Sequence, residues 1–168
     1  MSKAEERQNI VIVGGGNGGL STFNQLSSTL DASKYNLILV TPRPFFVHLP
    51  ATIRMVVTAN GKLEDSALMP LPEDRFNTGN KKLILGKVTS ITDDDIKGQY
   101  VVLDNGDSIE YTVLVLAPGS LWNTPVDFPD TKEEIVRVCE NWRSKFAEAK
   151  DVVLVGGGSI GVGKLNEL

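Results

Sequence analysis

The sequence predicts an α/β fold of three layers, in which a parallel β-sheet lies between helices on one face and an antiparallel β-meander on the other. Three observations lead to this prediction. Short runs of consecutive apolar residues, such as Ile10–Val13, are typical of strands buried on both faces of a parallel sheet. A glycine-rich turn and a helical pattern separate the first two runs, which is the order of a βαβ unit. Several shorter strand patterns separated by turn residues follow, and they indicate the meander.

The first element expected is a strand over Asn9–Val13. A glycine-rich turn at residues 14–19 ends this strand. A helix should follow, because apolar side chains then recur at helical spacing, at Leu20, Phe23, Leu26 and Leu30. A second apolar strand is expected over Asn36–Val40, with Thr41 at its carboxyl end. Together these elements close one βαβ unit.

The middle of the chain is expected to be irregular at first and then rich in strands. Prolines break residues 42–80 into loops and short helices. Strand patterns resume at residues 83–85, 88–91, 100–103 and 108–111, and the pair Asn105-Gly106 is a hairpin-turn signal. We interpret these four strands as an antiparallel meander.

The last third returns to the pattern of a parallel sheet. Val113–Leu116 is a continuous apolar run and is predicted to rejoin the central sheet. Thr131 and Glu134 have the spacing of a capping box, and they predict the start of a helix whose apolar face contains Ile135, Val138, Trp142 and Phe146. Val152–Val155 is predicted to be one more buried strand.

Composition excludes some classes of function. The 168 residues are 41% hydrophobic and 23% charged, with a net charge of −4, so the basic excess that nucleic acid selects for is missing. The single cysteine, Cys139, excludes an internal disulfide, and its place on an amphipathic helix favours a structural role. No apolar run is long enough to cross a bilayer, so any membrane contact is expected to be peripheral.

Two copies of a glycine motif carry the chemical prediction. Gly14-x-Gly16-x-x-Gly19 follows the first strand, and Gly156-x-Gly158-x-x-Gly161 follows the last. In such a motif the first glycine permits a tight turn, the second lets the backbone approach a pyrophosphate, and the third lets helix and strand pack closely. The following helix N-terminus favours an anion. We interpret the two copies as the starts of two nucleotide-binding units.

The chain resembles the FAD/NAD(P)H oxidoreductases related to apoptosis-inducing factor, especially the fungal mitochondrion-associated inducer-of-death and ferroptosis-suppressor-like branch. The resemblance rests on Ile10–Gly19, residues 39–51 with Arg54, Val113–Ser120 and Val152–Val162. It implies an FAD/NAD(P)-binding Rossmann-like fold that is incomplete at its C-terminal end. Residues 1–125 would be the N-terminal part of the FAD-binding domain. Residues 126–168 would be a connecting helix and the start of a truncated NAD(P)H-binding domain.

The resemblance also implies which residues bind cofactors. FAD would lie on the first glycine motif, and residues 44–50 would pass near the flavin. The cofactor-binding residues expected in this way are Gly14, Gly16, Asn17, Gly18, Gly19, Thr41, Arg43, Arg54, Val88, Ala117, Pro118, Gly119, Gly156, Gly158 and Gly161. Relatives usually read Ala-Thr-Gly-Ser where this chain has Ala117-Pro118-Gly119-Ser120, and proline removes one backbone donor there.

No catalytic side chain is predicted, because the cofactors themselves carry hydride transfer. His48, the only histidine, is expected to be packed or to line the cofactor. No metal site is expected. Disulfide reductases of the same fold use a cysteine pair beside the flavin, and this chain has only one cysteine.

The function expected from the resemblance is a flavoprotein of the NAD(P)H:quinone kind, similar to type II NADH dehydrogenases and partial in this chain. NAD(P)H would donate electrons, and a quinone or another small molecule would accept them. The expected location is cytoplasmic, including the periphery of mitochondria or lipid droplets. NADH or NADPH as donor, the identity of the acceptor and the oligomeric state stay open.

Two alternatives remain open. The chain could be a catalytically inactive, truncated nucleotide-binding fragment. It could also be an NADPH-binding module, because the acid expected about 20 residues past the glycines to bind the ribose is replaced by Thr41, with Arg43 nearby. A Tyr-x-x-x-Lys pair, which a short-chain reductase would add, is missing from the sequence.

Overall fold

The computed structural model describes residues 7–94, 98–123 and 125–158. The chain divides into two compact units, which we describe separately. The first unit comprises Met1–Phe45 and Pro70–Gly119, and the second comprises Phe46–Met69 and Ser120–Leu168.

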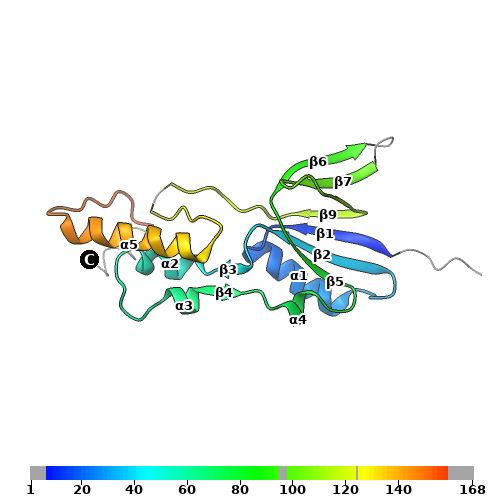
Figure 1. Ribbon diagram of the computed structural model, residues 1–168, viewed down its shortest axis with the longest axis horizontal. Helices are drawn as coiled ribbons and strands as arrows, with labels where there is room; N and C mark the ends of the chain where they lie inside the picture. Colours follow the sequence, from blue (N-terminus) through cyan, green and yellow to red (C-terminus); the bar gives the residue numbers. More distant parts are fainter. Residues whose placement is uncertain (1–6, 95–97, 124, 159–168) are drawn as a thin grey trace, which may run out of the picture. The chain divides into compact units, whose positions relative to one another are not determined.

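A four-stranded parallel sheet forms the centre of the first unit (Figure 1). Its order is β5-β2-β1-β9, with bounds Lys81–Leu85, Tyr35–Thr41, Gln8–Val13 and Val113–Leu116. Helix α1, Asn17–Thr29, connects β1 to β2. The predicted βαβ unit is therefore confirmed, and so is the return of residues 113–116 to the parallel sheet.

One prediction for this sheet is wrong. Residues 83–85 were expected in the meander, but β5 pairs in parallel with β2, from Leu37↔Lys81 to Thr41↔Leu85. Burial gives the physical reason. Leu83 packs against the helix side of the sheet and Ile84 against the meander side, so both faces of β5 are covered, as in parallel strands. A three-residue apolar pattern does not reveal which strand it pairs with.

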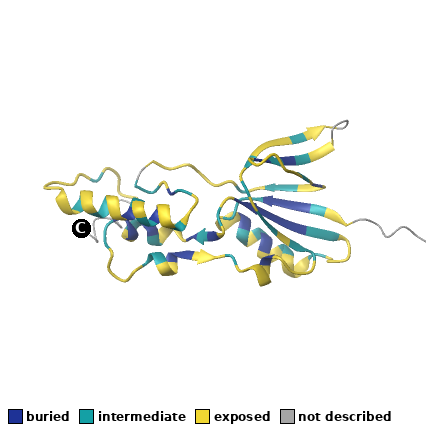
Figure 2. Cartoon of the chain, in the orientation of Figure 1, coloured by how far each residue is buried: buried dark blue, intermediate teal, exposed yellow. Residues whose placement is uncertain are grey.

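The meander is built from β6, Val88–Asp94, β7, Gly98–Leu103, and β8, Ser108–Glu110, all antiparallel. It covers one face of the parallel sheet, where a buried cluster joins sheet and meander: Val11, Ile38, Val40, Val101, Leu103 and Tyr111. In Figure 2, many of the buried residues lie in the strands of the parallel sheet and in α1.

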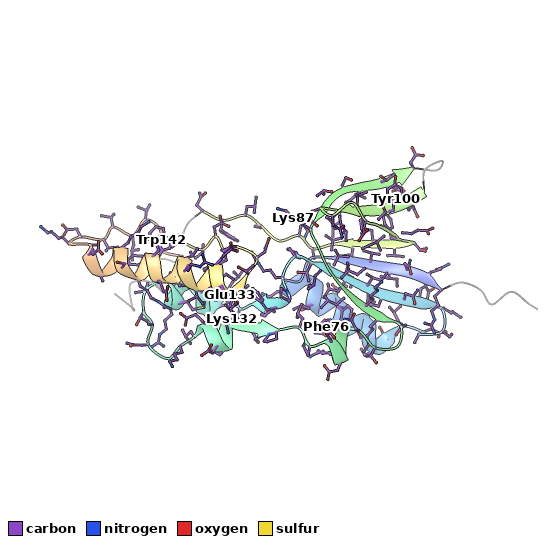
Figure 3. The ribbon with its side chains drawn as sticks, in the orientation of Figure 1. Phe76, Lys87, Tyr100, Lys132, Glu133 and Trp142 are labelled. Atoms are coloured by element: carbon purple, nitrogen blue, oxygen red, sulfur yellow. The ribbon has the colours of Figure 1, made fainter. Side chains whose placement is uncertain are left out.

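Helices α1 and α4, Glu73–Phe76, cover the opposite face. The Phe23 and Phe76 rings stack with centroids 4.9 Å apart, over a second buried cluster that includes Ile12, Leu37 and Leu39. Figure 3 labels Phe76 on the helix side and Tyr100 on the meander side. The predicted three-layer arrangement is confirmed in this unit.

The second unit contains α2, Leu49–Met55, α3, Glu64–Ala67, and α5, Lys132–Glu148. Ile135 and Cys139 of α5 are completely buried. The predicted start of α5 is confirmed: the Thr131 hydroxyl accepts from the Glu134 N–H at 3.3 Å and donates to the Glu134 carboxylate at 2.6 Å. Two short strands, β3, Phe45–Val47, and β4, Leu68–Pro70, pair with each other.

The strand predicted over Val152–Val155 is absent, because residues 151–157 are irregular and Val153 and Val155 are 84% and 95% exposed. A parallel strand needs a neighbour for its backbone hydrogen bonds, and none of the strands in the described ranges pairs with this segment. Gly156 and Gly158 follow it, whereas Gly161 lies outside the described residues.

Candidate nucleotide-binding site

Three segments meet at the carboxyl edge of the parallel sheet. The Gly14 N–H, after β1, donates to the carbonyl of Val40 at 2.8 Å, and the Ala117 N–H, after β9, donates to the carbonyl of Val13 at 2.8 Å. Thr41 ends β2 beside them. In open α/β sheets this edge is where ligands bind.

Two glycines of the first motif are required by the packing of the chain itself. Gly14 has φ +114°, and a Cβ there would lie 2.0 Å from the carbonyl oxygen of Ala117. A Cβ on Gly19 would lie 1.8 Å from the carbonyl oxygen of Gly14. Both contacts are with backbone, which cannot move aside cheaply. The loop is therefore closely packed against β9 and against α1.

Gly16 differs from these two glycines. A Cβ placed on it would meet no atom within 4 Å, and its backbone is extended, with φ −86°. Gly16 is also the N-cap of α1, where no side chain caps the helix and the first turn carries no acidic residue. Uncapped amides and the positive end of the helix dipole thus adjoin open space, which fits a phosphate group.

Thr41 supports this loop from below. It is 3% exposed, and a Cβ on Gly15 would lie 2.6 Å from its hydroxyl oxygen. The same oxygen accepts from the Arg43 N–H at 3.4 Å. The sequence placed Thr41 at the ribose end of the site but missed Gly15, although the run of three glycines was a signal for a close approach.

The end of β5 belongs to the same edge. The Gly86 N–H donates to the carbonyl of Thr41 at 3.0 Å. The Lys87 N–H then donates to the Asp104 carboxylate at 3.2 Å, and the Asp104 N–H donates back to the Lys87 carbonyl at 2.9 Å. Sequence reasoning missed Gly86 and Lys87 because it put β5 in the meander. Figure 3 shows Lys87 where the chain passes from β5 to β6.

The first unit thus gathers Gly14, Gly16, Asn17, Gly18, Gly19, Thr41, Arg43 and Ala117, with Pro118 and Gly119 next in the chain. Val88 begins β6 and packs, half-buried, against the cluster on the meander side of the sheet.

The remaining expected residues lie in the second unit. Arg54 is near the end of α2, and His48 precedes that helix. The His48 side chain is exposed, with its ring 6.4 Å from that of Phe46, so the expectation that it is packed is not met. Its role as a cofactor-lining residue stays a prediction. Gly156 and Gly158 have open surroundings and lie in the irregular segment.

Within residues 7–94, 98–123 and 125–158, His, Cys, Asp and Glu side chains form no group of three or more that could hold a metal ion. Over the same part of the chain, every helix is too short or too polar to pass through a lipid bilayer.

Comparison with known proteins places this geometry among flavoprotein reductases. The sequence profile described as pyridine nucleotide-disulphide oxidoreductase matches residues 8–163. A FAD-dependent oxidoreductase from Flammulina velutipes is 44% identical over 108 residues, which are 64% of this chain and 33% of that protein. Ferroptosis suppressor protein 1 from Xenopus laevis is 31% identical over 160 residues, covering 94% and 39% of the two chains.

Solved structures agree with these sequence matches. A ferredoxin reductase from Rhodopseudomonas palustris superposes with a TM-score of 0.62 at 25% identity, covering 94% of this chain and 39% of that chain. The chain therefore spans between about a third and two fifths of the length of the relatives it matches.

Proposed function

The chain belongs to the pyridine nucleotide-disulphide oxidoreductase family, and from this premise we propose that its first glycine motif binds FAD. We further propose that the whole protein passes electrons from NAD(P)H through the flavin to a quinone. The first proposal concerns residues that the structure describes. The second concerns the longer protein that the relatives represent.

The open N-terminus of α1 is the observation that carries FAD binding. Gly14 and Gly19 bring loop, strand and helix together, and Gly16 leaves the space above the helix free. A bulky side chain at Gly16 would occupy this space without disturbing the chain. The pyrophosphate of a dinucleotide has the charge and size that this position selects.

Bound FAD would supply the hydride-accepting group. The part of this chain is to bind and orient. The amides of Asn17, Gly18 and Gly19 begin α1 and would donate to the pyrophosphate, while Ala117 fixes the position of the loop through its contact with Gly14. Pro118 contributes no N–H, so this segment is proposed to contact the cofactor mainly through its shape.

The proposed electron donor and electron acceptor are inferred from the relatives and not from the geometry of this site. The family name supports a pyridine nucleotide, and we propose that Gly156 and Gly158 begin its binding unit. Residues 1–125 would then belong to the FAD domain and 126–168 to the start of the second domain. The quinone acceptor and a place at the periphery of mitochondria or lipid droplets rest on the family resemblance alone.

A binding experiment with two glycine variants tests the proposal. We expect the purified chain to bind FAD, measured by quenching of flavin fluorescence. Gly16→Val should weaken FAD binding at least about tenfold, because its side chain enters the space reserved for phosphate, while lowering the free energy of unfolding by only about 1 kcal/mol through the poorer N-cap. Gly157→Val is the matched control, because its surroundings are equally open and φ is not in the left-handed region.

Gly157→Val should bind FAD like the wild type. The proposal is wrong if the wild-type chain does not bind FAD, or if Gly16→Val binds it with unchanged affinity. Oxidation of NADH or NADPH with a soluble quinone separates turnover from binding. A chain that binds FAD without any turnover would support the alternative of a nucleotide-binding fragment.

A further inference from the structure

We propose that the ribose end of the first nucleotide site accepts adenine nucleotides that carry a 2′-phosphate, so that FAD and NADPH-like ligands compete for it. The inference rests on the proposed nucleotide function of the glycine loop. It goes beyond that function by naming a second class of ligand and the residue, Thr41, that permits it.

Position 41 lies where selection for a free ribose 2′-hydroxyl is normally made. It is the last residue of β2, next to the glycine loop, and about 20 residues beyond the motif an acidic side chain ordinarily accepts hydrogen bonds from the ribose. A carboxylate there would repel a 2′-phosphate. Thr41 carries no charge, so this element of rejection is missing.

Burial limits the contribution of the Thr41 side chain to ribose recognition. Its side chain is 3% exposed beneath Gly15, and its hydroxyl oxygen already accepts from the Arg43 N–H. The hydroxyl therefore supports the glycine loop. Thr41 acts as a positioning residue for the pyrophosphate and leaves the ribose without a carboxylate partner on β2.

The charges around this edge favour a phosphate. In the first unit, residues 32–45 contain no aspartate or glutamate, and they include Arg43 two residues after Thr41. Lys87 follows Gly86, whose N–H binds the Thr41 carbonyl. The carboxylate that the hydrogen bonds place at this edge is that of Asp104, and it accepts from the Lys87 N–H. An arginine near the ribose is a known means of accommodating a 2′-phosphate.

Two ligands that differ only in the phosphate test the inference. ADP-ribose and 2′-phospho-ADP-ribose would be titrated into the purified chain by calorimetry. We expect the wild-type chain to bind the phosphorylated ligand at least as tightly as ADP-ribose. Thr41→Asp should weaken binding of 2′-phospho-ADP-ribose relative to ADP-ribose about tenfold, which is about 1.4 kcal/mol. Thr41→Asn introduces a side chain with the shape of aspartate but no charge. It should keep the wild-type ratio of the two ligand affinities.

The outcomes separate this inference from the proposed function. If the wild-type chain binds ADP-ribose more tightly than the phosphorylated ligand, the inference is wrong and the nucleotide site stands. If neither ligand binds, both are wrong. If Thr41→Asp fails to fold, the ratio of the two ligand affinities in the wild-type chain decides. A Gly16→Val chain that still binds both ligands would place them elsewhere and overturn the inference.

Discussion

Cys139 lies on α5 without exposed surface, and burial raises the pKa of its thiol to about 11. The nearby carboxylates of Glu64 and Glu140 raise this pKa further, whereas the Arg143 guanidinium opposes them. A thiol held neutral in this way is a poor nucleophile at ordinary pH. The residue therefore has the properties of a small core side chain, as its helix position predicted.

The raised pKa predicts how stability depends on pH. The unfolded thiol has a pKa of 9.0 and the folded thiol about 11, so the fold favours the protonated form. This contribution, on the order of 2–3 kcal/mol, is fully present below pH 9 and is lost as the pH rises towards 11. Urea unfolding between pH 8 and pH 11 should show a steeper loss of stability for the wild type than for Cys139→Ala. If the free energy of unfolding falls equally with pH in both chains, the raised pKa of Cys139 is contradicted.

Single residues show where sequence reasoning reached its limit at the site. The spacing of Gly14, Gly16 and Gly19 was sufficient to predict the loop, because each glycine of the motif has a separate steric role. The packing of Thr41 beneath Gly15 was not predictable. It depends on the distance between the glycine loop and the end of β2, and the periodicity of the sequence contains no information about that distance.

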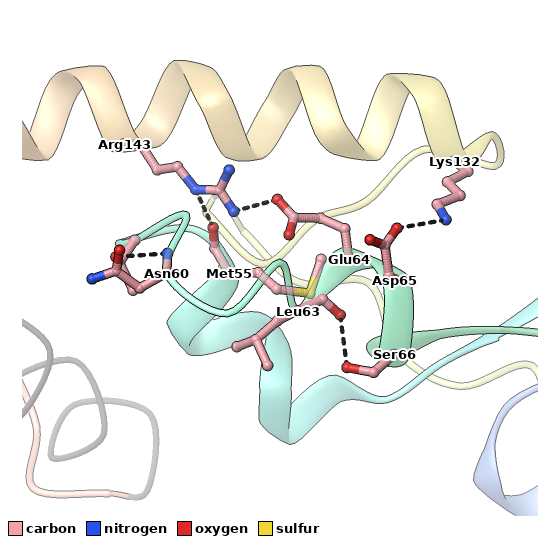
Figure 4. Close-up of polar contacts among 9 residues, drawn as sticks. Met55, Asn60, Leu63, Glu64, Asp65, Ser66, Lys132 and Arg143 are labelled. Carbon is pink, nitrogen blue, oxygen red and sulfur yellow. Dashed lines mark hydrogen bonds and ion pairs between the residues drawn. The ribbon is translucent and has the colours of Figure 1, made fainter.

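At the scale of elements, one side chain of α5 links α2 and α3 (Figure 4). The Nε of Arg143 donates to the carbonyl of Met55 at 2.7 Å, and its guanidinium forms an ion pair with Glu64. The two side chains of this pair are only 16% and 12% exposed. A second ion pair, Lys132 with Asp65 at 3.4 Å, is much more exposed, at 43% and 72%.

These two pairs predict different costs for the loss of a cation. Arg143→Met should lower the free energy of unfolding by about 3 kcal/mol, because it leaves the Glu64 carboxylate and the Met55 carbonyl without a partner in a largely buried place. Lys132→Met is the matched control on the same helix and should cost less than about 1 kcal/mol. Urea denaturation measures both. Similar losses in the two variants would show that burial does not decide the cost.

Elements with strong local signals were predicted correctly, including β9, whose partner β1 is distant in the sequence. β1, α1, β2, β9 and α5 have clear periodicity, turn glycines or a cap. β5 was assigned to the wrong sheet, because its short apolar run does not distinguish a parallel strand from a strand of the meander that follows it. Val152–Val155 has the composition of a strand but no pairing strand among the described residues.

At the scale of the whole molecule, ligand binding should be visible as stability. A ligand that binds only the folded chain, at a hundred times its dissociation constant, adds about 2.7 kcal/mol to the free energy of unfolding. We expect this increase for the wild-type chain with FAD in urea denaturation. Gly16→Val, which we expect to fold normally, should gain at most about 1.4 kcal/mol at the same FAD concentration, because its binding is at least about tenfold weaker. An equal gain in both chains would mean that FAD binds away from the glycine loop.

The family was predictable from the whole chain because two glycine motifs follow strand-like runs. Among the described residues, a strand, loop and helix are built around the first motif, whereas residues 151–157 are irregular and Gly161 of the second motif lies outside the described residues. The chain spans about a third to two fifths of the relatives it matches. The proposed electron transfer therefore concerns the longer protein that the relatives represent, and the proposed part of this site is to bind FAD.

The openness around Gly16 has a consequence for how such a chain can change over generations. Gly14 and Gly19 are fixed by backbone contacts, so natural selection for a folded chain is enough to retain them even without a ligand. Gly16 has an ordinary backbone conformation, and a Cβ placed on it would meet no atom within 4 Å. A lineage that had stopped using the nucleotide would be free to replace it. In a chain that no longer bound a nucleotide, position 16 would therefore tolerate substitution more readily than positions 14 and 19.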